Sequence, residues 1–173
     1  VSKEAFNIDG FGKKIVESFW KIKLIQFPQD IFKLDYNKIQ KLEGWGELSV
    51  ENLKYSINEK KKISLEKLIY ALGIRHIGLE NAKLLSKYFT SFQNFKNLSV
   101  TNKYNDLLNI DGLGETQVNS IKNFFSVPKN FEVLIELEKL LTIKKPKNEK
   151  KNGLLKDKFF LVTGKLYNLS RAE

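Results

Sequence analysis

Apolar residues recur at fixed distances around four glycines, Gly12, Gly46, Gly78 and Gly114. In each copy an apolar side chain lies four residues before the glycine, one before it, four after it and seven after it. These side chains are, copy by copy, Ile8, Phe11, Val16 and Phe19; Leu42, Trp45, Val50 and Leu53; Ile74, Ile77, Ala82 and Leu85; Ile110, Leu113, Val118 and Ile121. The copies are 34, 32 and 36 residues apart, a spacing typical of a repeated supersecondary unit.

Each copy predicts a helix, a tight turn and a second helix. Positions four and seven after the glycine lie on one face of a helix that begins just beyond it, and the residue four before it would close a preceding helix. The apolar residue before the glycine is predicted to fold inward. Trp45 is the largest of these residues and the one we expect to reach solvent.

Further helical patterns lie between and after the copies, over residues 31–42, 64–72 and 131–141, and Pro128 should end the helix that follows the fourth copy. The fold class expected is all-α, with four tandem helix–turn–helix units in residues 1–143. Residues 144–153 are lysine-rich with Pro and Gly, and read as a flexible basic linker. In the remaining piece, 154–173, the run 158–166 predicts a strand and a turn, the start of an α/β unit.

Composition narrows the function classes. There is no cysteine and a single histidine, which argues against disulfides and conventional zinc sites. No apolar run approaches the roughly 20 residues that cross a bilayer, so we expect no membrane partner and a cytoplasmic protein. The net charge of +10 favours a polyanion, but about half of it lies in residues 144–158. Arginine occurs only at positions 75 and 171, so the basic side chains favour phosphate contact over base reading.

The turns themselves are candidate phosphate sites. Two glycines around one residue, at the start of a helix, expose backbone N–H groups beside the positive end of the helix dipole. Side chains next to the first and fourth turns could add charge or hydrogen bonds. His76 stands where the first glycine is expected, which we interpret as a structural variant of the turn and a weaker phosphate site. The candidate residues are Gly10, Gly12, Lys13, Lys14, Gly44, Gly46, His76, Gly78, Gly112, Gly114, Thr116 and Gln117.

No catalytic residue is predicted. Lys33, Asp35 and Tyr36 superficially match the K-x-D-G motif of nucleotidyl transferases, but tyrosine replaces the required glycine. No cysteine or serine nucleophile has a histidine partner in the sequence pattern, and the acidic residues form no metal-binding constellation. The expected activity is binding, with no metal site.

The glycine turns resemble helix-hairpin-helix motifs, and their number and order resemble the helix-hairpin-helix domain of bacterial NAD-dependent DNA ligase. ALGIRHIGLENAKLLSKYF (71–89) matches the family's third motif closely. The opening VSKEAFNIDGFG resembles the segment that follows the family's four-cysteine zinc module. The ending GLLKDKFFLVTGKLYNLSRAE resembles the start of its BRCT domain, where Thr163 and Gly164 match phosphate-pocket positions. Relative to the family, residues 101–106 (TNKYND) lengthen the loop before the fourth motif by a few residues.

The resemblance implies a piece of a nick-sealing ligase of DNA replication and repair, located in the bacterial cytoplasm with the nucleoid. Its partners would be nicked duplex DNA and the remaining ligase domains. NAD, magnesium and zinc would act in those other parts, so this chain alone should be inactive and bind none of them. A monovalent cation could sit at the hairpins.

Two alternatives stay open at this point. One is a stand-alone helix-hairpin-helix accessory protein of DNA repair or junction binding, although such proteins usually carry two hairpins. The other is a helical scaffold whose hairpins pack on protein.

Overall fold

The computed structural model describes residues 2–146, which are mostly helical, as predicted. The strands are β1 and β2, and the helices include two of the 3-10 type, η1 and η2. In chain order the elements are α1 (Lys13–Lys21), η1 (Pro28–Lys33), α2 (Tyr36–Gln40), α3 (Glu47–Glu59), β1 (Lys62–Ser64), α4 (Leu65–Ala71), α5 (Leu79–Phe89), α6 (Phe92–Thr101), η2 (Tyr104–Asn109), α7 (Glu115–Ser126), α8 (Pro128–Leu140) and β2 (Thr142–Lys144).

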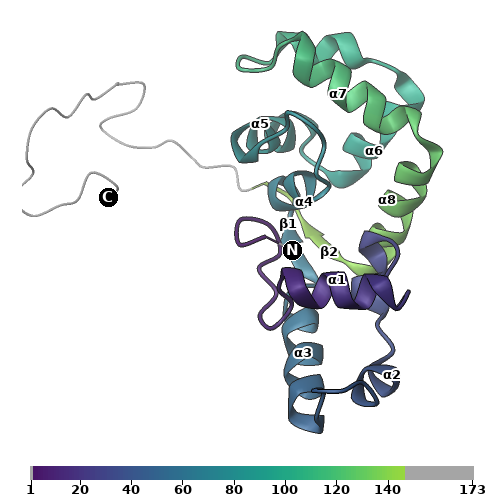
Figure 1. The fold of residues 1–173 in the computed structure, drawn as a ribbon. Coiled ribbons are helices and arrows are strands. Elements are labelled where there is room, and N and C mark those ends of the chain that lie inside the picture. Colours follow the sequence, from purple (N-terminus) through teal and green to yellow (C-terminus); the bar gives the residue numbers. More distant parts are fainter. Residues whose placement is uncertain (1, 147–173) are drawn as a thin grey trace, which may run out of the picture.

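The helices form two groups that share one core. Helices α1, α2 and α3 lie at one end of the molecule and α5, α6 and α7 at the other, with α4, the strands and α8 between them (Figure 1). The apolar side chains of both groups belong to a single buried cluster that runs from Ile8 to Leu141. The repeats therefore share one hydrophobic core rather than standing as separate modules.

A short parallel sheet departs from the all-α expectation. Strand β1 pairs with β2 in the register Ile63 with Ile143, and Thr142 N–H donates to the Lys61 carbonyl at 2.8 Å. Lys144, assigned to the linker from the sequence, is the last residue of β2. Three-residue strands are too short to show an alternating pattern, so only the folded chain reveals this pair.

Two predicted helical segments differ in the structure. The 31–42 pattern is split into η1 and α2, because Asp35 adopts an extended backbone and its side chain accepts the Lys38 N–H as an N-cap. Residues 2–12 contain no helix before the first turn, and the segment before the fourth turn is the 3-10 helix η2. The prediction of a preceding helix was therefore wrong for the first copy, and for the fourth the element is 3-10.

The remaining helical predictions differ less. Helix α4 covers the 64–72 pattern and α8 the 131–141 pattern, and α7 ends at Ser126, just before Pro128. Helix α6 was not predicted. It ends at Thr101, so the 101–106 segment is a helix end followed by η2 rather than a simple loop extension.

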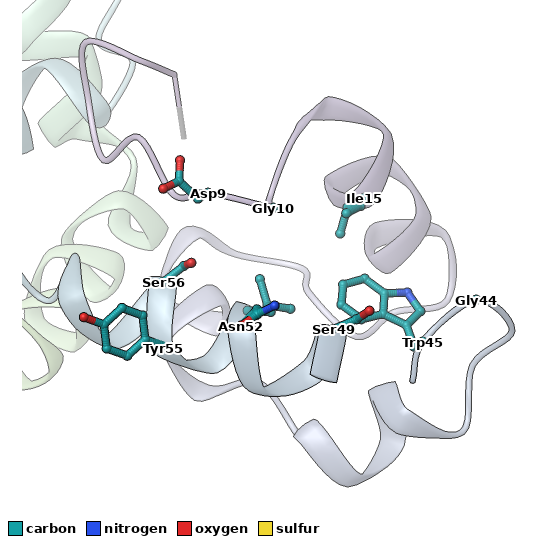
Figure 2. A pocket seen from close by; sticks show the side chains of 10 residues that line it. Asp9, Gly10, Ile15, Gly44, Trp45, Ser49, Asn52, Tyr55 and Ser56 are labelled. Atoms are coloured by element: carbon teal, nitrogen blue, oxygen red, sulfur yellow. The ribbon is translucent and has the colours of Figure 1, made fainter. Parts of the chain in front are cut away.

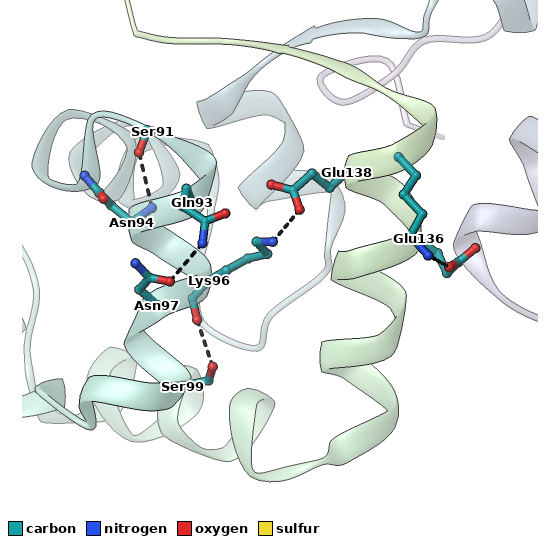
Figure 3. Close-up of polar contacts among 9 residues, drawn as sticks. Ser91, Gln93, Asn94, Lys96, Asn97, Ser99, Glu136 and Glu138 are labelled. Carbon is teal, nitrogen blue, oxygen red and sulfur yellow. Dashed lines mark hydrogen bonds and ion pairs between the residues drawn. The ribbon is translucent and has the colours of Figure 1, made fainter.

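Helix α8 is tied by ion pairs to both halves of the chain. On one side Glu136 pairs with Lys33 of η1, and with Lys139 one turn along its own helix. On another side Glu138 pairs with Lys96 of α6, a lysine that is largely buried. Figure 3 shows Glu136 and Glu138 leaving α8 in different directions. The helix thus connects η1, from the first half, to α6, from the second.

The Glu136 ion pairs predict an acid-dependent loss of stability. Hydrogen bonds from Lys139 and Lys33 lower the pKa of Glu136 from 4.5 to about 2. A depressed carboxyl pKa adds stability that is present above pH 4.5 and is lost as the pH falls toward 2. Urea unfolding of the chain and of the Glu136→Gln variant should therefore differ most above pH 4.5 and converge near pH 2. The exposed Glu51→Gln serves as the control, and a constant difference across this range would contradict the assignment.

Candidate nucleic-acid interface

The four glycine turns have the same backbone hydrogen bond. In each, the N–H of the central apolar residue donates to the carbonyl three residues earlier: Phe11 to Ile8 at 3.2 Å, Trp45 to Leu42 at 3.1 Å, Ile77 to Ile74 at 3.0 Å and Leu113 to Ile110 at 3.0 Å. The residue before the central one has a positive φ in every turn: 71° at Gly10, 80° at Gly44, 61° at His76 and 92° at Gly112. This is the position at which a type II turn demands a left-handed backbone.

His76 therefore keeps the turn that glycine forms elsewhere. Its φ of 61° is unusual for a residue with a side chain. The amide Nδ2 of Asn81 donates to the His76 carbonyl at 3.1 Å and links the turn to the first turns of α5. The prediction of a structural variant is confirmed in the backbone, and the ring is exposed.

The second glycine of each turn begins a helix. Gly12, Gly46, Gly78 and Gly114 are the N-caps of α1, α3, α5 and α7, all with extended backbones. Their carbonyls accept the N–H groups of Val16, Val50, Ala82 and Val118. None of the first three helices has a side-chain cap, so the first N–H groups of these helices have no acceptor in the part of the chain that the structure describes. Their N-cap glycines are exposed.

The first three of these N-cap glycines have no internal reason to lack a side chain. A Cβ at Gly12, Gly46 or Gly78 would meet no atom within 4 Å. Their extended φ values are open to any residue. Among residues 2–146, nothing thus covers the backbone at these helix starts.

The fourth turn is partly closed. Gly114 N–H donates to the side-chain Oε1 of Gln117 at 3.1 Å, so this predicted phosphate ligand also serves its own helix start. Thr116 remains exposed at the start of α7. A Cβ at Gly112 would lie 3.0 Å from Leu84 Cδ1, which places the fourth turn against α5. The third and fourth turns therefore belong to one packed unit.

The first and second turns also meet. Phe19 of α1 lies with its ring centroid 5.8 Å from that of Phe11 and 5.4 Å from that of Trp45, and so joins the central residues of both turns. Phe11, Ile77 and Leu113 are only 1%, 4% and 6% exposed, whereas Trp45 is partly exposed, as the sequence predicted.

An open groove lies beside this contact, between the first glycines of the two turns. Its volume is about 650 Å³, and Gly10 lines one side while Gly44 and Trp45 line the other (Figure 2). Polar residues of α3, among them Ser49 and Asn52, form its floor. The groove opens to solvent near the starts of α1 and α3.

The two lysines predicted to assist phosphate binding, Lys13 and Lys14, are exposed at the start of α1. Lys13 lies 3.8 Å from Glu17, and both side chains are largely in solvent, so the pair is weak. Lys14 is also exposed. Thr163 and Gly164 fall outside the described residues.

The described residues hold neither a metal cluster nor a membrane span. No group of three or more His, Asp or Glu side chains gathers in residues 2–146 in a way that could hold a metal ion. No helix in this part of the chain is long and apolar enough to cross a bilayer. Within the K-x-D-G look-alike, Lys33 pairs with Glu136 and Asp35 caps α2, which are structural roles.

The glycines should respond differently to alanine. Gly112→Ala combines a φ of 92° with a 3.0 Å contact to Leu84, and should lower the free energy of unfolding by about 1–3 kcal/mol. Gly78→Ala meets open space and an extended backbone, and should cost under about 1 kcal/mol through a weaker N-cap. Urea unfolding of both variants measures this, and equal losses would refute the difference in environment.

Comparison with known proteins finds a helix-hairpin-helix family model and several DNA ligases. The family model described as "Helix-hairpin-helix motif" matches residues 67–134, which contain the third and fourth turns. A DNA ligase of Pelagibacter ubique is 61% identical over all of this chain, which covers 26% of that protein. DNA ligases of Rickettsia bellii and Rickettsia rickettsii are 41% and 42% identical over all of this chain, which covers 27% of each.

The chain thus spans about a quarter of the length of these relatives, and similarity extends from its first residue to its last. Over its whole length the chain is homologous to a part of the DNA ligases, and its residues 67–134 contain a helix-hairpin-helix motif.

Proposed function

We propose that this chain grips duplex DNA through backbone phosphates, as the DNA-binding part of an NAD-dependent ligase that seals nicks in replication and repair. In this proposal all four glycine turns are helix-hairpin-helix motifs. The ligase homologues and the motif over residues 67–134 support DNA binding. The shared hydrogen bond and positive φ extend the same geometry to the first and second turns.

The observation that carries the proposal is the uncovered backbone at Gly12, Gly46 and Gly78. Neither packing nor backbone conformation requires glycine there. Outward-facing N–H groups beside the positive end of a helix form a site for phosphate. A ligand that approaches the backbone closely explains why these positions lack a side chain.

Binding of this type does not read sequence. Backbone N–H groups at a turn meet phosphate oxygens and not base edges. Of the two arginines in the chain, one lies in the described residues, so bidentate contacts to guanine are scarce.

The remaining chemistry belongs to other ligase domains. In our proposal NAD, magnesium and zinc act in those domains, and a monovalent cation binds at the hairpins of this chain. Our proposal includes the resemblance of residues 154–173, which lie outside the described residues, to the start of a BRCT domain, with Thr163 and Gly164 matching its phosphate-pocket positions. The site of action is the bacterial cytoplasm, at nicked DNA of the nucleoid. Identity of 61% to a DNA ligase over the whole chain argues against the accessory-protein and scaffold alternatives.

Aspartate at the helix starts separates folding from binding. It is a good N-cap, so Gly12→Asp, Gly46→Asp and Gly78→Asp should keep or raise the free energy of unfolding. The carboxylate would occupy the phosphate position, so affinity for a nicked duplex should fall about tenfold per variant. Fluorescence anisotropy measures binding, and Gly→Ser at the same positions provides uncharged N-cap controls. Unchanged affinity in all three aspartate variants would favour the protein-scaffold alternative.

Salt dependence tests whether the folded part or the lysine-rich tail binds. Each neutralised phosphate should steepen the slope of log affinity against log salt by about 0.9. The full chain should give a slope near −4 or steeper, and most of it should remain when residues 147–173 are deleted. A slope that collapses on this deletion would assign binding to the tail.

A further inference from the structure

The four turns share their backbone geometry but not their charge. In each turn one residue lies between the carbonyl that accepts the turn hydrogen bond and the residue with a positive φ. From the first turn to the fourth, these residues are Asp9, Glu43, Arg75 and Asp111. The first residues of the helices that follow are Lys13, Glu47, Leu79 and Glu115. The second and fourth turns thus carry two carboxylates each. The first turn carries two lysines against one aspartate, and the third carries Arg75 and His76.

The carboxylates of the second and fourth turns face solvent. Glu43, Glu47, Asp111 and Glu115 are exposed, and none forms an ion pair within residues 2–146. A carboxylate in the first turn of a helix favours the same dipole end that a phosphate would occupy. These carboxylates therefore compete with phosphate and repel it.

The third turn is arranged in the opposite way. Arg75 and His76 are both exposed at the turn. Glu80, an acidic residue in the first turn of α5, is paired with Lys83 at 2.7 Å, which offsets its charge. Arginine offers five N–H donors in a fork that fits phosphate, and a neutral histidine ring offers one more.

His76 keeps its side chain at a position where the other three turns have glycine. A positive φ disfavours a residue with a Cβ, so the ring is held against a local backbone preference. Such rule-breaking positions concentrate at functional sites. His76 directly follows Arg75 in the sequence, and both residues are exposed.

We infer that the grip on DNA is polarised: the first and third turns hold phosphates with charged side chains, and the second and fourth offer only uncharged donors, which are backbone N–H groups and, in the fourth, the exposed Thr116. Each half of the molecule then has one strong and one weak turn. Arg75 and His76 are the phosphate-contacting side chains of the third turn, which is a strong site rather than the weak one expected from its missing glycine. This inference rests on the proposed function.

Charge-removing variants at the two kinds of turn should act in opposite directions. On the full chain with a nicked duplex, Arg75→Gln should weaken binding about three- to tenfold and reduce the salt slope by about 1, as should Lys14→Gln. Asp111→Asn with Glu115→Gln should strengthen binding about two- to fivefold. The exposed Glu59→Gln, at the end of α3, controls for net charge alone. Equal gains from Glu59→Gln and from the fourth-turn variant would overturn the inference, as would an Arg75→Gln variant that binds like the wild type.

His76→Gly separates contact from conformation. Glycine suits the positive φ, so Tm should stay the same or rise by up to about 4 °C. DNA affinity should nevertheless fall about two- to fivefold, because a phosphate donor is lost. A variant of unchanged affinity would remove His76 from the contact.

The wild-type measurement distinguishes failure of this inference from failure of the proposed function. A wild-type chain with no DNA affinity at low salt would refute DNA binding itself. A wild-type chain with a steep salt slope, whose four turns respond alike to charge removal, would refute only the division between strong and weak turns.

Discussion

The structure depends on one repeated constraint, an apolar side chain held inward between a left-handed residue and a helix N-cap. The turn hydrogen bond and the positive φ reverse the chain, and burial of Phe11, Ile77 or Leu113 anchors the reversal in the core. Because the anchor is internal, the following helix start is left facing outward. The same burial that stabilises the fold therefore exposes the N–H groups proposed to bind phosphate.

The four turns have fixed relative positions because contacts join neighbouring turns and the two halves of the molecule. Phe19 contacts the central residues of the first two turns, and Leu84 lies against the fourth turn. Helix α8 then links η1 to α6 through Glu136 and Glu138, and β2 returns to β1. A ligand that spans several turns would meet a preset arrangement and lose little entropy in ordering them.

Much of the candidate site could be predicted from the sequence. The glycine pairs, their spacing and the helix faces are local properties, and the structure shows helices starting at all four N-cap glycines. Other features could not be predicted from the sequence. The break between η1 and α2 depends on an Asp35 cap within an apolar pattern that a continuous helix would also satisfy. Helix α6 and the strands are short elements whose stability comes from packing.

The sequence by itself determined the helical class, the repeat and the chemistry at each turn, because these follow from residue type at short spacing. Only the tertiary structure decided which glycines are free and which are packed. Gly112 and Gly78 look alike in the sequence, yet one lies against Leu84 and the other faces open space. The contact between Leu84 and Gly112 joins residues far apart in the chain, and the local pattern around a glycine does not encode whether such a contact exists.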